Sequence, residues 1–278
     1  MQTPYDRHLG ARGCHLNVAD ILFENQKPSE INRMADLKDR VALVTGGSRG
    51  MGKAIALALA EAGAAVAVNY RERDQEALSV VEAIHRGGGK AAAFPADVSI
   101  AGDIEHMVSD IEGRLGPIDI LVNNAGIAPV RGLDDITEED FERTLAVNLK
   151  SAFLCIQAVS SGMRARHWGR IINVSSIGAR AGAPTVSVAY AAAKAGLEGL
   201  TRGYALRLAK EGVTVNAVAP GLVDTEMGRP LIEAGVPARI PVGRSGTVDE
   251  IAQAVMLLVR NAYITGQTLA VNGGGLFS

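Results

Sequence analysis

The sequence predicts an α/β fold, a single doubly wound domain in which helices cover both faces of a mostly seven-stranded parallel sheet. Short β-branched runs recur between longer amphipathic stretches. Runs such as Val41–Val44 and Ile120–Val122 are apolar throughout and do not alternate with polar residues, as expected of strands buried on both faces. A glycine-rich turn lies between the first such run and the first helical stretch. Together, these three observations are typical of a sheet that binds a nucleotide.

Seven runs are the expected strands, and long helical stretches separate them. In chain order they are Val41–Thr45, Ala65–Asn69, Ala91–Phe94, Asp119–Asn123, Arg170–Val174, Val213–Val218 and Thr268–Val271. Connections of this length allow neighbouring strands to run parallel. Ligands of such sheets bind beyond the carboxyl ends of the strands, so the residues that follow each strand are the candidate site.

The alternation of strands and helices is even from Arg40 to the end, without a linker, and it predicts one domain over residues 34–278. Residues 1–33 differ, because they are polar, mixed in charge and lack a sustained apolar segment. We expect a flexible N-terminal extension there, with Met34 as the functional start or the preceding segment as a loose tail. No stretch of the sequence approaches transmembrane length.

Composition favours small-molecule chemistry. The formal net charge of −2 gives no basic field that would attract nucleic acid or an anionic membrane. The two cysteines, Cys14 and Cys155, are far apart and suit a reducing, cytoplasmic location. The five histidines are scattered singly, so no metal site is expected.

The glycine-rich turn runs from Thr45 to Gly52 and opens into a helix expected over Lys53–Ala62. Its glycines let backbone N–H groups approach a pyrophosphate, and the helix N-terminus adds unpaired donors. We therefore predict a phosphate cradle, with an ordinary glycine-rich turn as the alternative. The expected cofactor-binding residues are Gly46, Ser48, Arg49, Gly50, Met51 and Gly52.

The residues after the second strand, Asn69-Tyr70-Arg71, include no acidic side chain. An acidic residue there would bind the ribose 2′-hydroxyl of NAD and repel a 2′-phosphate. Its absence, with Arg49 and Arg71 nearby, favours NADP(H) over NAD(H), with Asn69 as a further contact. The alternative is that both arginines are solvated surface charges.

Asp97-Val98 follows the third strand. Asp97 could accept a hydrogen bond from an adenine amino group, or it could cap the helix that starts near Asp103.

Tyr190 and Lys194 are four positions apart in an alanine-rich helical stretch, so they share a face one turn apart. A neighbouring cation favours the phenolate and should lower the pKa of the tyrosine. The pair is thus a candidate proton donor, although a helix surface can also present it without function.

Further motifs complete a known pattern. Asn123–Gly126 follows the fourth strand, Ser175-Ser176 follows the fifth, and Pro220-Gly221 follows the sixth. With the glycine turn and the Tyr190-x-x-x-Lys194 pair, the chain resembles the short-chain dehydrogenase/reductase family from about Leu37 to its end. The resemblance implies a Rossmann-like fold and an NAD(P)-dependent oxidoreductase.

The resemblance also implies catalytic roles. Tyr190 would protonate the substrate carbonyl oxygen, and Lys194 would lower the pKa of Tyr190 and hold the nicotinamide ribose. Ser176 would donate a hydrogen bond to the same oxygen. Asn148, in a long helix begun by the capping signal at Thr137, would hold a water that connects Lys194 to solvent. The interval from Ser176 to Tyr190 is one residue longer than the family pattern, so Ser175 stays an alternative.

Two more groups of cofactor contacts follow from the resemblance. The first lies near the adenosine ribose and the second against the nicotinamide. They are Asn124, Ala125 and Gly126, then Pro220, Gly221, Val223 and Thr225. Tyr190 and Lys194 complete the cofactor contacts, and residues 226–240 would form a mobile lid over the substrate.

Among subfamilies, the chain most resembles the 3-oxoacyl carrier-protein reductases of fatty acid metabolism. This implies NADPH-dependent reduction of a ketone to a secondary alcohol, on 3-oxoacyl thioesters that are free or bound to a carrier protein. The alternatives are another NADP(H)-linked alcohol, sugar or steroid dehydrogenase, and a nucleotide-sensing protein without catalysis. Relatives are commonly homotetramers, and Gly196, Gly199 and Gly203 would permit close helix approach between subunits or within the chain.

Overall fold

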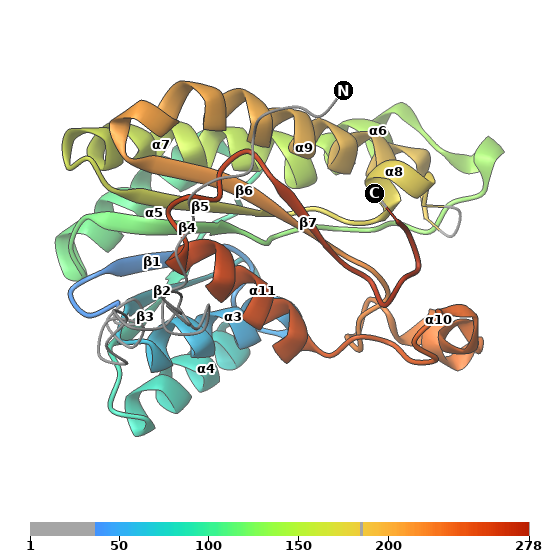
Figure 1. The fold of residues 1–278 in the computed structure, drawn as a ribbon, viewed down its shortest axis with the longest axis horizontal. Coiled ribbons are helices and arrows are strands. Elements are labelled where there is room, and N and C mark those ends of the chain that lie inside the picture. Colours follow the sequence, from blue (N-terminus) through green and yellow to red (C-terminus); the bar gives the residue numbers. More distant parts are fainter. Residues whose placement is uncertain (1–36, 184–185, 278) are drawn as a thin grey trace, which may run out of the picture. The chain divides into compact units, whose positions relative to one another are not determined.

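A computed structural model describes residues 37–183 and 186–277, which form one parallel sheet in the order β3-β2-β1-β4-β5-β6-β7 (Figure 1). The strands are β1 (Val41–Val44), β2 (Ala65–Tyr70), β3 (Ala91–Pro95), β4 (Ile118–Asn123), β5 (Gly169–Val174), β6 (Val213–Pro220) and β7 (Thr268–Val271). The predicted doubly wound architecture and all seven predicted strands are confirmed. Strand order reverses between β1 and β4, which places a crevice at their carboxyl ends.

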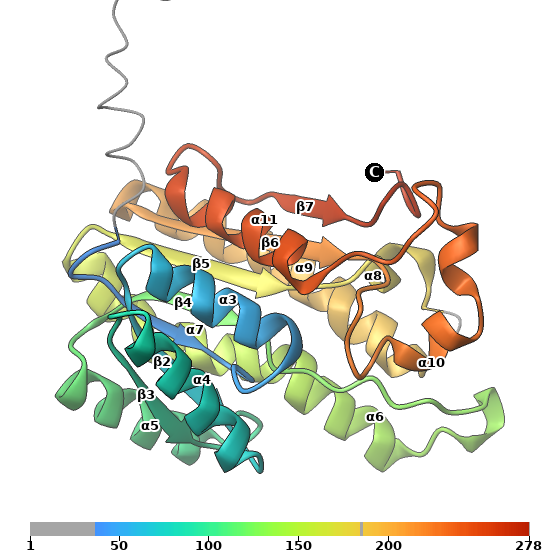
Figure 2. The ribbon, with the colours of Figure 1, turned by 90° about the horizontal axis from the view of Figure 1, so that it is seen from below.

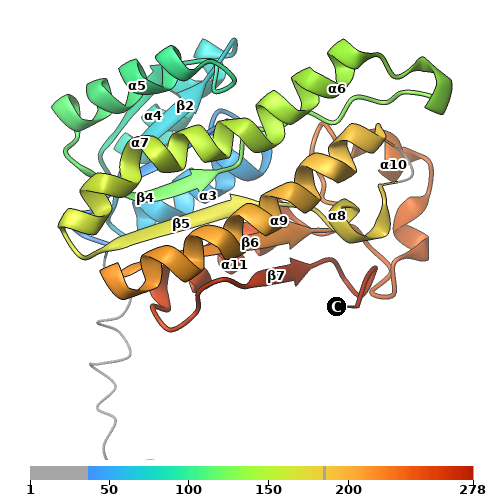
Figure 3. The ribbon, with the colours of Figure 1, turned by 90° about the horizontal axis from the view of Figure 1, so that it is seen from above.

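Helices cover both faces of the sheet. One face carries α3 (Gly50–Glu61), α4 (Asp74–Arg86) and α11 (Val248–Arg260), seen in front of the sheet in Figure 2. The other carries α5 (Ala101–Arg114), α7 (Ser151–Ala165) and α9 (Val188–Leu208), seen in Figure 3. The strands lack an apolar–polar alternation because each face packs against a helical layer.

The remaining elements are short or lie near the carboxyl edge of the sheet. They are α6 (Glu138–Leu145), the π-helical turn η2 (Ala146–Lys150), α8 (Gly178–Ala181), α10 (Arg229–Glu233) and the 3₁₀ turns η1 (Leu133–Asp135), η3 (Ala209–Glu211) and η4 (Val236–Arg239). The predicted capping signal at Thr137 is present, since its side chain accepts a hydrogen bond from the Asp140 amide. Helix α11 begins with a capping box in which Thr247 and Glu250 bond each other's backbone amides.

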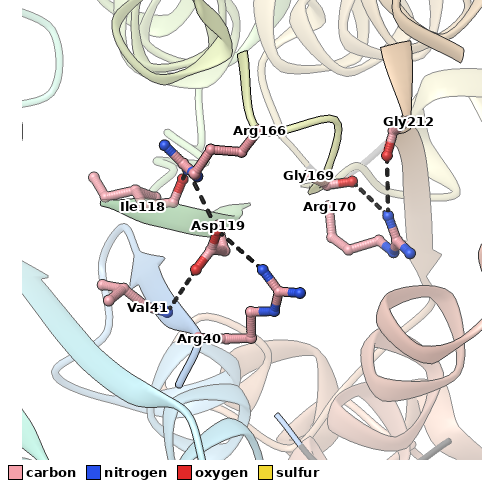
Figure 4. A network of polar contacts seen from close by, with 8 residues as sticks. All are labelled: Arg40, Val41, Ile118, Asp119, Arg166, Gly169, Arg170 and Gly212. Atoms are coloured by element: carbon pink, nitrogen blue, oxygen red, sulfur yellow. Dashed lines mark hydrogen bonds and ion pairs between the residues drawn. The ribbon is translucent and has the colours of Figure 1, made fainter. Parts of the chain in front are cut away.

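A polar network ties the amino ends of the central strands together (Figure 4). Asp119 of β4 is buried and accepts from the Val41 amide at 3.2 Å. Its other oxygen pairs with Arg40 at 3.5 Å and Arg166 at 3.3 Å. Beside this network, the buried Arg170 guanidinium donates to the carbonyl oxygens of Gly169 and Gly212, at 2.8 and 3.4 Å (Figure 4). The network anchors the end of the sheet opposite the predicted site.

Trp168 makes cation–π contacts with two of these arginines. Its ring centroid is 3.9 Å from the Arg40 guanidinium carbon and 4.5 Å from that of Arg170. Such stacking on an aromatic face stabilises cations and holds their planes in place.

The predicted extension over residues 1–33 lies outside the described residues. No helix of residues 37–183 and 186–277 is long and apolar enough to cross a membrane.

Candidate active site

A cavity of about 500 Å³ opens at the carboxyl ends of β1 to β4. Most predicted cofactor contacts line it, namely Gly46, Ser48, Arg49, Gly50, Met51, Gly52, Asn69, Arg71, Asp97, Val98, Asn124, Ala125, Gly126 and Thr225. The sequence therefore located residues that are far apart in the chain but gather at one edge of the sheet.

The glycine loop brings backbone to the cavity wall. Gly46 and Gly50 have φ values of +61° and +52°, a region that L side chains rarely adopt. A Cβ atom at Gly52 would overlap the Gly46 carbonyl oxygen and lie 2.5 Å from the Asn124 amide nitrogen. Asn124 braces the loop by donating to the carbonyl oxygens of Thr45 and Gly46, at 2.9 and 3.1 Å.

Helix α3 begins at this loop without a side-chain cap. Its first amide groups are therefore left for a ligand, and the helix dipole favours an anion there. These features fit a dinucleotide pyrophosphate.

Asn69 lines the cavity, and its side chain also holds the surrounding backbone together. Its buried carboxamide accepts from the Gly46 amide at 3.1 Å and donates to the carbonyl oxygens of Phe94 and Ala96, at 3.3 and 3.2 Å. The side chain thus joins the ends of β1, β2 and β3 and shapes the glycine loop.

Asp97 does not cap a helix, so that alternative is wrong. Helix α5 begins at Ala101 with Ile100 as its N-cap, whereas Asp97 accepts from the Ser99 amide and hydroxyl at 2.9 and 2.7 Å. Burial raises the pKa of Asp97, but the Ser99 hydrogen bonds and the Arg71 charge outweigh it, so the pKa is lowered. Asp97 therefore presents a carboxylate to the cavity.

The cavity rim carries more charge than predicted. Arg71 pairs with Glu72 at 2.5 Å and approaches Asp97 at 3.7 Å. Arg49 pairs with Glu226, and so does Arg73. Sequence reasoning missed the lining residues Tyr70, Glu72, Arg73, Ala96, Ile127, Val147, Glu226 and Met227. Arg73 could have been found, because it belongs to the same charged run after β2 as Arg71.

Tyr190 and Lys194 lie one turn apart on α9, as predicted, with the Lys194 ammonium nitrogen 5.7 Å from the Tyr190 ring centroid. The Ser176 hydroxyl accepts a hydrogen bond from the Gly178 amide at 3.0 Å. A Cβ atom at Gly178 would lie 3.3 Å from Ser176 Oγ and 3.5 Å from Tyr190 Cε1, so both side chains border this glycine.

Ser175 faces the interior. Its hydroxyl is buried and lies within hydrogen-bond distance of the Lys194 carbonyl oxygen and the Glu198 carboxylate, at 3.3 and 3.4 Å. Glu198 also accepts from Arg180 at 3.1 Å, which ties α8 to α9. Of the two serines, Ser176 is the one beside the Tyr190 ring.

Asn148 lies in the π-helical turn between α6 and α7, which the sequence did not predict. Its carboxamide accepts from the Ile127 amide at 3.1 Å and donates to the carbonyl oxygens of Ile127 and Thr144, at 2.9 and 3.0 Å. A Cβ atom at Gly126 would lie 2.7 Å from Asn148 Oδ1 and 3.6 Å from Lys194 Nζ. Gly126 thus connects the cavity wall with both side chains. Single π turns are frequent at functional sites.

The pKa values correct one expectation. Burial raises the pKa of Tyr190, and the nearby Ser176 side chain offsets this only in part, so the predicted lowering is wrong. Burial also lowers the pKa of Lys194 to about 8. The Lys194 ammonium donates to the Val174 carbonyl oxygen at 2.7 Å.

The predicted nicotinamide contacts lie along the end of β6. Gly221 donates to the Val271 carbonyl oxygen at 2.9 Å, and Val223 is buried and bridges to Gly246. Thr225 faces the glycine loop and lines the cavity, whereas Pro220, Gly221, Val223, Tyr190 and Lys194 do not line it. Within the described part of the chain, no group of three His, Cys, Asp or Glu residues could hold a metal ion.

Known proteins are similar to this chain in sequence and in fold. The sequence model of a family described as enoyl-(acyl carrier protein) reductase matches residues 46–275. A 3-oxoacyl-[acyl-carrier-protein] reductase of Synechocystis sp. is 43% identical over 87% of this chain and 98% of its own length. An acetoacetyl-CoA reductase of Rhizobium meliloti is 42% identical over 86% of this chain and 99% of its own. A crystal structure of a putative gluconate dehydrogenase from Agrobacterium tumefaciens has a TM-score of 0.82 and 33% identity, with 87% of this chain and 97% of that one covered.

The fold, the cavity and these similarities define an oxidoreductase that uses a nicotinamide cofactor and acts on ketone or alcohol groups. The chain belongs to the short-chain dehydrogenase/reductase family.

Proposed function

We propose that this protein reduces 3-oxoacyl thioesters to 3-hydroxyacyl thioesters with NADPH. The observation that carries the chemistry is the grouping of Ser176 and Tyr190 beside Gly178, with Lys194 one helical turn from Tyr190. Reductases of 3-oxoacyl and acetoacetyl thioesters among the relatives support the substrate class.

The glycine loop and the rim arginines would hold NADPH, which would supply the hydride for the carbonyl carbon. Tyr190 donates its phenolic proton to the carbonyl oxygen, and Ser176 donates a hydrogen bond to the same oxygen as charge develops on it. Because burial raises the pKa of Tyr190, its proton is present at neutral pH and available for reduction. Lys194 keeps its charge below pH about 8, where it can hold a ribose hydroxyl and stabilise the phenolate that Tyr190 becomes after giving up its proton.

We assign the adenosine end of the cofactor to the arginines at the cavity rim. Arg49, Arg71 and Arg73 lie near the ends of β1 and β2, where a 2′-phosphate would be placed. These three guanidiniums support NADP(H) over NAD(H).

The test compares substrates and cofactors. NADPH oxidation by the wild-type chain should be rapid with acetoacetyl thioesters and slower with NADH. Tyr190→Phe should lower kcat by about 10²-fold to 10⁴-fold while NADPH still binds. The matched control is Tyr263→Phe, because Tyr263 is 99% exposed. No turnover of any thioester would refute the substrate class, and unchanged kcat in Tyr190→Phe would refute the proton donor.

A second substrate class follows from the structural neighbour, which is titled a putative gluconate dehydrogenase. Oxidation of sugar acids, assayed with the same enzyme and both oxidised cofactors, separates this possibility from thioester reduction.

We also propose a homotetramer that associates through α6, α7 and α9. A Cβ atom at Gly196 would meet Leu149 of the same chain at 2.8 Å, but one at Gly199 meets no atom within 4 Å. Next to them lies a shallow hollow lined by Leu145, Leu149, Phe153 and Leu200. Analytical ultracentrifugation should give a mass four times that of the chain.

A further inference from the structure

Two arginines at the cavity rim share one carboxylate oxygen. Arg49 is the N-cap residue of α3, and Arg73 is the N-cap residue of α4. Both form ion pairs with the same oxygen, Oε2 of Glu226, and the Arg73 pair measures 3.5 Å. Glu226 comes from the segment between β6 and α10. Three segments that are far apart in the sequence therefore meet at a single negative charge.

This negative charge lies where the proposed cofactor needs an anion site. Arg49, Arg73 and Glu226 all line the cavity, and the two arginines follow β1 and β2. Guanidinium groups pair with carboxylates and phosphates through the same geometry. The Glu226 carboxylate thus engages two guanidinium groups that could also pair with a ribose 2′-phosphate.

The ion pairs of Glu226 with Arg49 and Arg73 can be exchanged for pairs with a phosphate. The side chains of Arg49, Arg73 and Glu226 are 49%, 44% and 57% exposed. Exposed ion pairs contribute little net stability, because water solvates both partners when the pair opens. A doubly charged phosphate with three free oxygens can satisfy both guanidiniums, whereas one carboxylate oxygen is shared between them.

The other acidic groups at the rim already have different partners. Glu72 pairs with Arg71, and Asp97 accepts from Ser99. Glu76 pairs with Arg73 at 3.2 Å but lies on α4 and does not line the cavity. Glu226 is therefore the carboxylate of the lining that bridges the two arginines.

We propose that Glu226 is a specificity-determining residue, whose carboxylate competes with the 2′-phosphate of NADP(H) for Arg49 and Arg73 and is displaced when NADP(H) binds. Displacement frees the segment before α10 from the rim, so phosphate recognition and release of this segment are coupled. NAD(H) lacks the phosphate and leaves the bridge in place. The inference rests on the proposed function, because it requires a nicotinamide dinucleotide in the cavity.

The experiment measures the Kd of NADPH and of NADH by titration calorimetry, for the full wild-type chain, Glu226→Gln and Glu233→Gln. Glu233 is exposed on α10, so its variant removes the same charge from the same region without touching the bridge. In Glu226→Gln the Kd of NADPH should fall about threefold to tenfold, the range expected from opening two exposed ion pairs. The Kd of NADH should change less than about twofold, and Glu233→Gln should leave both constants unchanged.

An Arg73→Ala background tests the bridge itself. There the gain in NADPH affinity from Glu226→Gln should shrink, because one of the two competing pairs is gone. Equal changes for NADPH and NADH, an unchanged NADPH constant, or the same gain in both backgrounds would overturn the inference. The ratio of the NADH and NADPH Kd values of the wild type tests the proposed NADP(H) preference. The inference about Glu226 is tested separately, by the change in that ratio in Glu226→Gln.

Discussion

Ser175 and Ser176 are neighbours in the sequence, but their hydroxyls serve different parts of the fold. Ser176 lies beside Tyr190 next to Gly178, whereas Ser175 is buried against Lys194 and Glu198 of α9. Ser176→Ala should therefore lower kcat by about 10²-fold to 10³-fold with little loss of stability. Ser175→Ala should lower the free energy of unfolding by about 1 kcal/mol and affect kcat less. Steady-state kinetics and urea unfolding of both variants check this contrast, and the opposite ranking of kcat would exchange the two roles.

Burial of Lys194 should make the folded chain more stable as pH rises. Burial lowers its pKa to about 8 from a usual value of 10.5, so the folded chain binds fewer protons than the unfolded chain between these limits. Considered alone, this group makes the folded state more stable as pH rises through that window, and its burial is least favourable below pH 8.

The comparison with Lys194→Met isolates this effect, because the variant has no titrating group there. The difference in unfolding free energy, wild type minus variant, should increase by about 1 kcal/mol per pH unit from about pH 8 to about pH 9.5. Urea unfolding at several pH values measures the difference. A difference that stays constant with pH would mean that Lys194 titrates outside this range.

At the scale of elements, helix α11 depends on its first turn. The Thr247 hydroxyl accepts from the Glu250 amide at 3.2 Å, and Glu250 accepts from the Thr247 amide at 2.8 Å. Thr247→Ala removes one half of this capping box and should lower the free energy of unfolding by about 0.5 to 2 kcal/mol. Thr247→Ser keeps the hydroxyl and is the matched control in the same urea titrations. Equal losses in both variants would show that the methyl group, and not the cap, matters.

The strands could be predicted because their physical signature is local. Apolar runs without alternation mark strands covered on both faces, and the seven ranges differ from the observed ones by two residues or fewer at each end. Glycine spacing likewise located the loop that lines the cavity. The π-helical turn at Asn148 has no such local signature, because it depends on hydrogen bonds to Ile127 from another segment.

The same limit applies to single side chains. Asn69 lines the cavity, as the sequence led us to expect, but the use of its carboxamide by backbone groups of three strand ends could not be predicted. Glu226 and Arg73 could not be paired from the sequence, since more than 150 positions separate them. Long-range pairing of this kind is decided by the assembled sheet.

At the scale of the whole molecule, Asp119 links β1, β4 and the segment after α7. Its side chain is 4% exposed, whereas Arg40 and Arg166 remain 35% and 31% exposed. Asp119→Ala leaves the Val41 amide unpaired and should lower the free energy of unfolding by about 1 to 3 kcal/mol. Asp119→Asn keeps an acceptor and should lose less. Thermal unfolding, with NADPH affinity as a second measurement, checks that the loss concerns stability and leaves cofactor binding unchanged.

The polar network in Figure 4 and the cavity lie at opposite ends of the same strands. Evolution can therefore vary the loops that choose a substrate without disturbing the clamp that keeps the sheet assembled. An engineered variant could therefore gain thermal stability from substitutions around the polar network while its substrate selectivity is changed separately at the cavity.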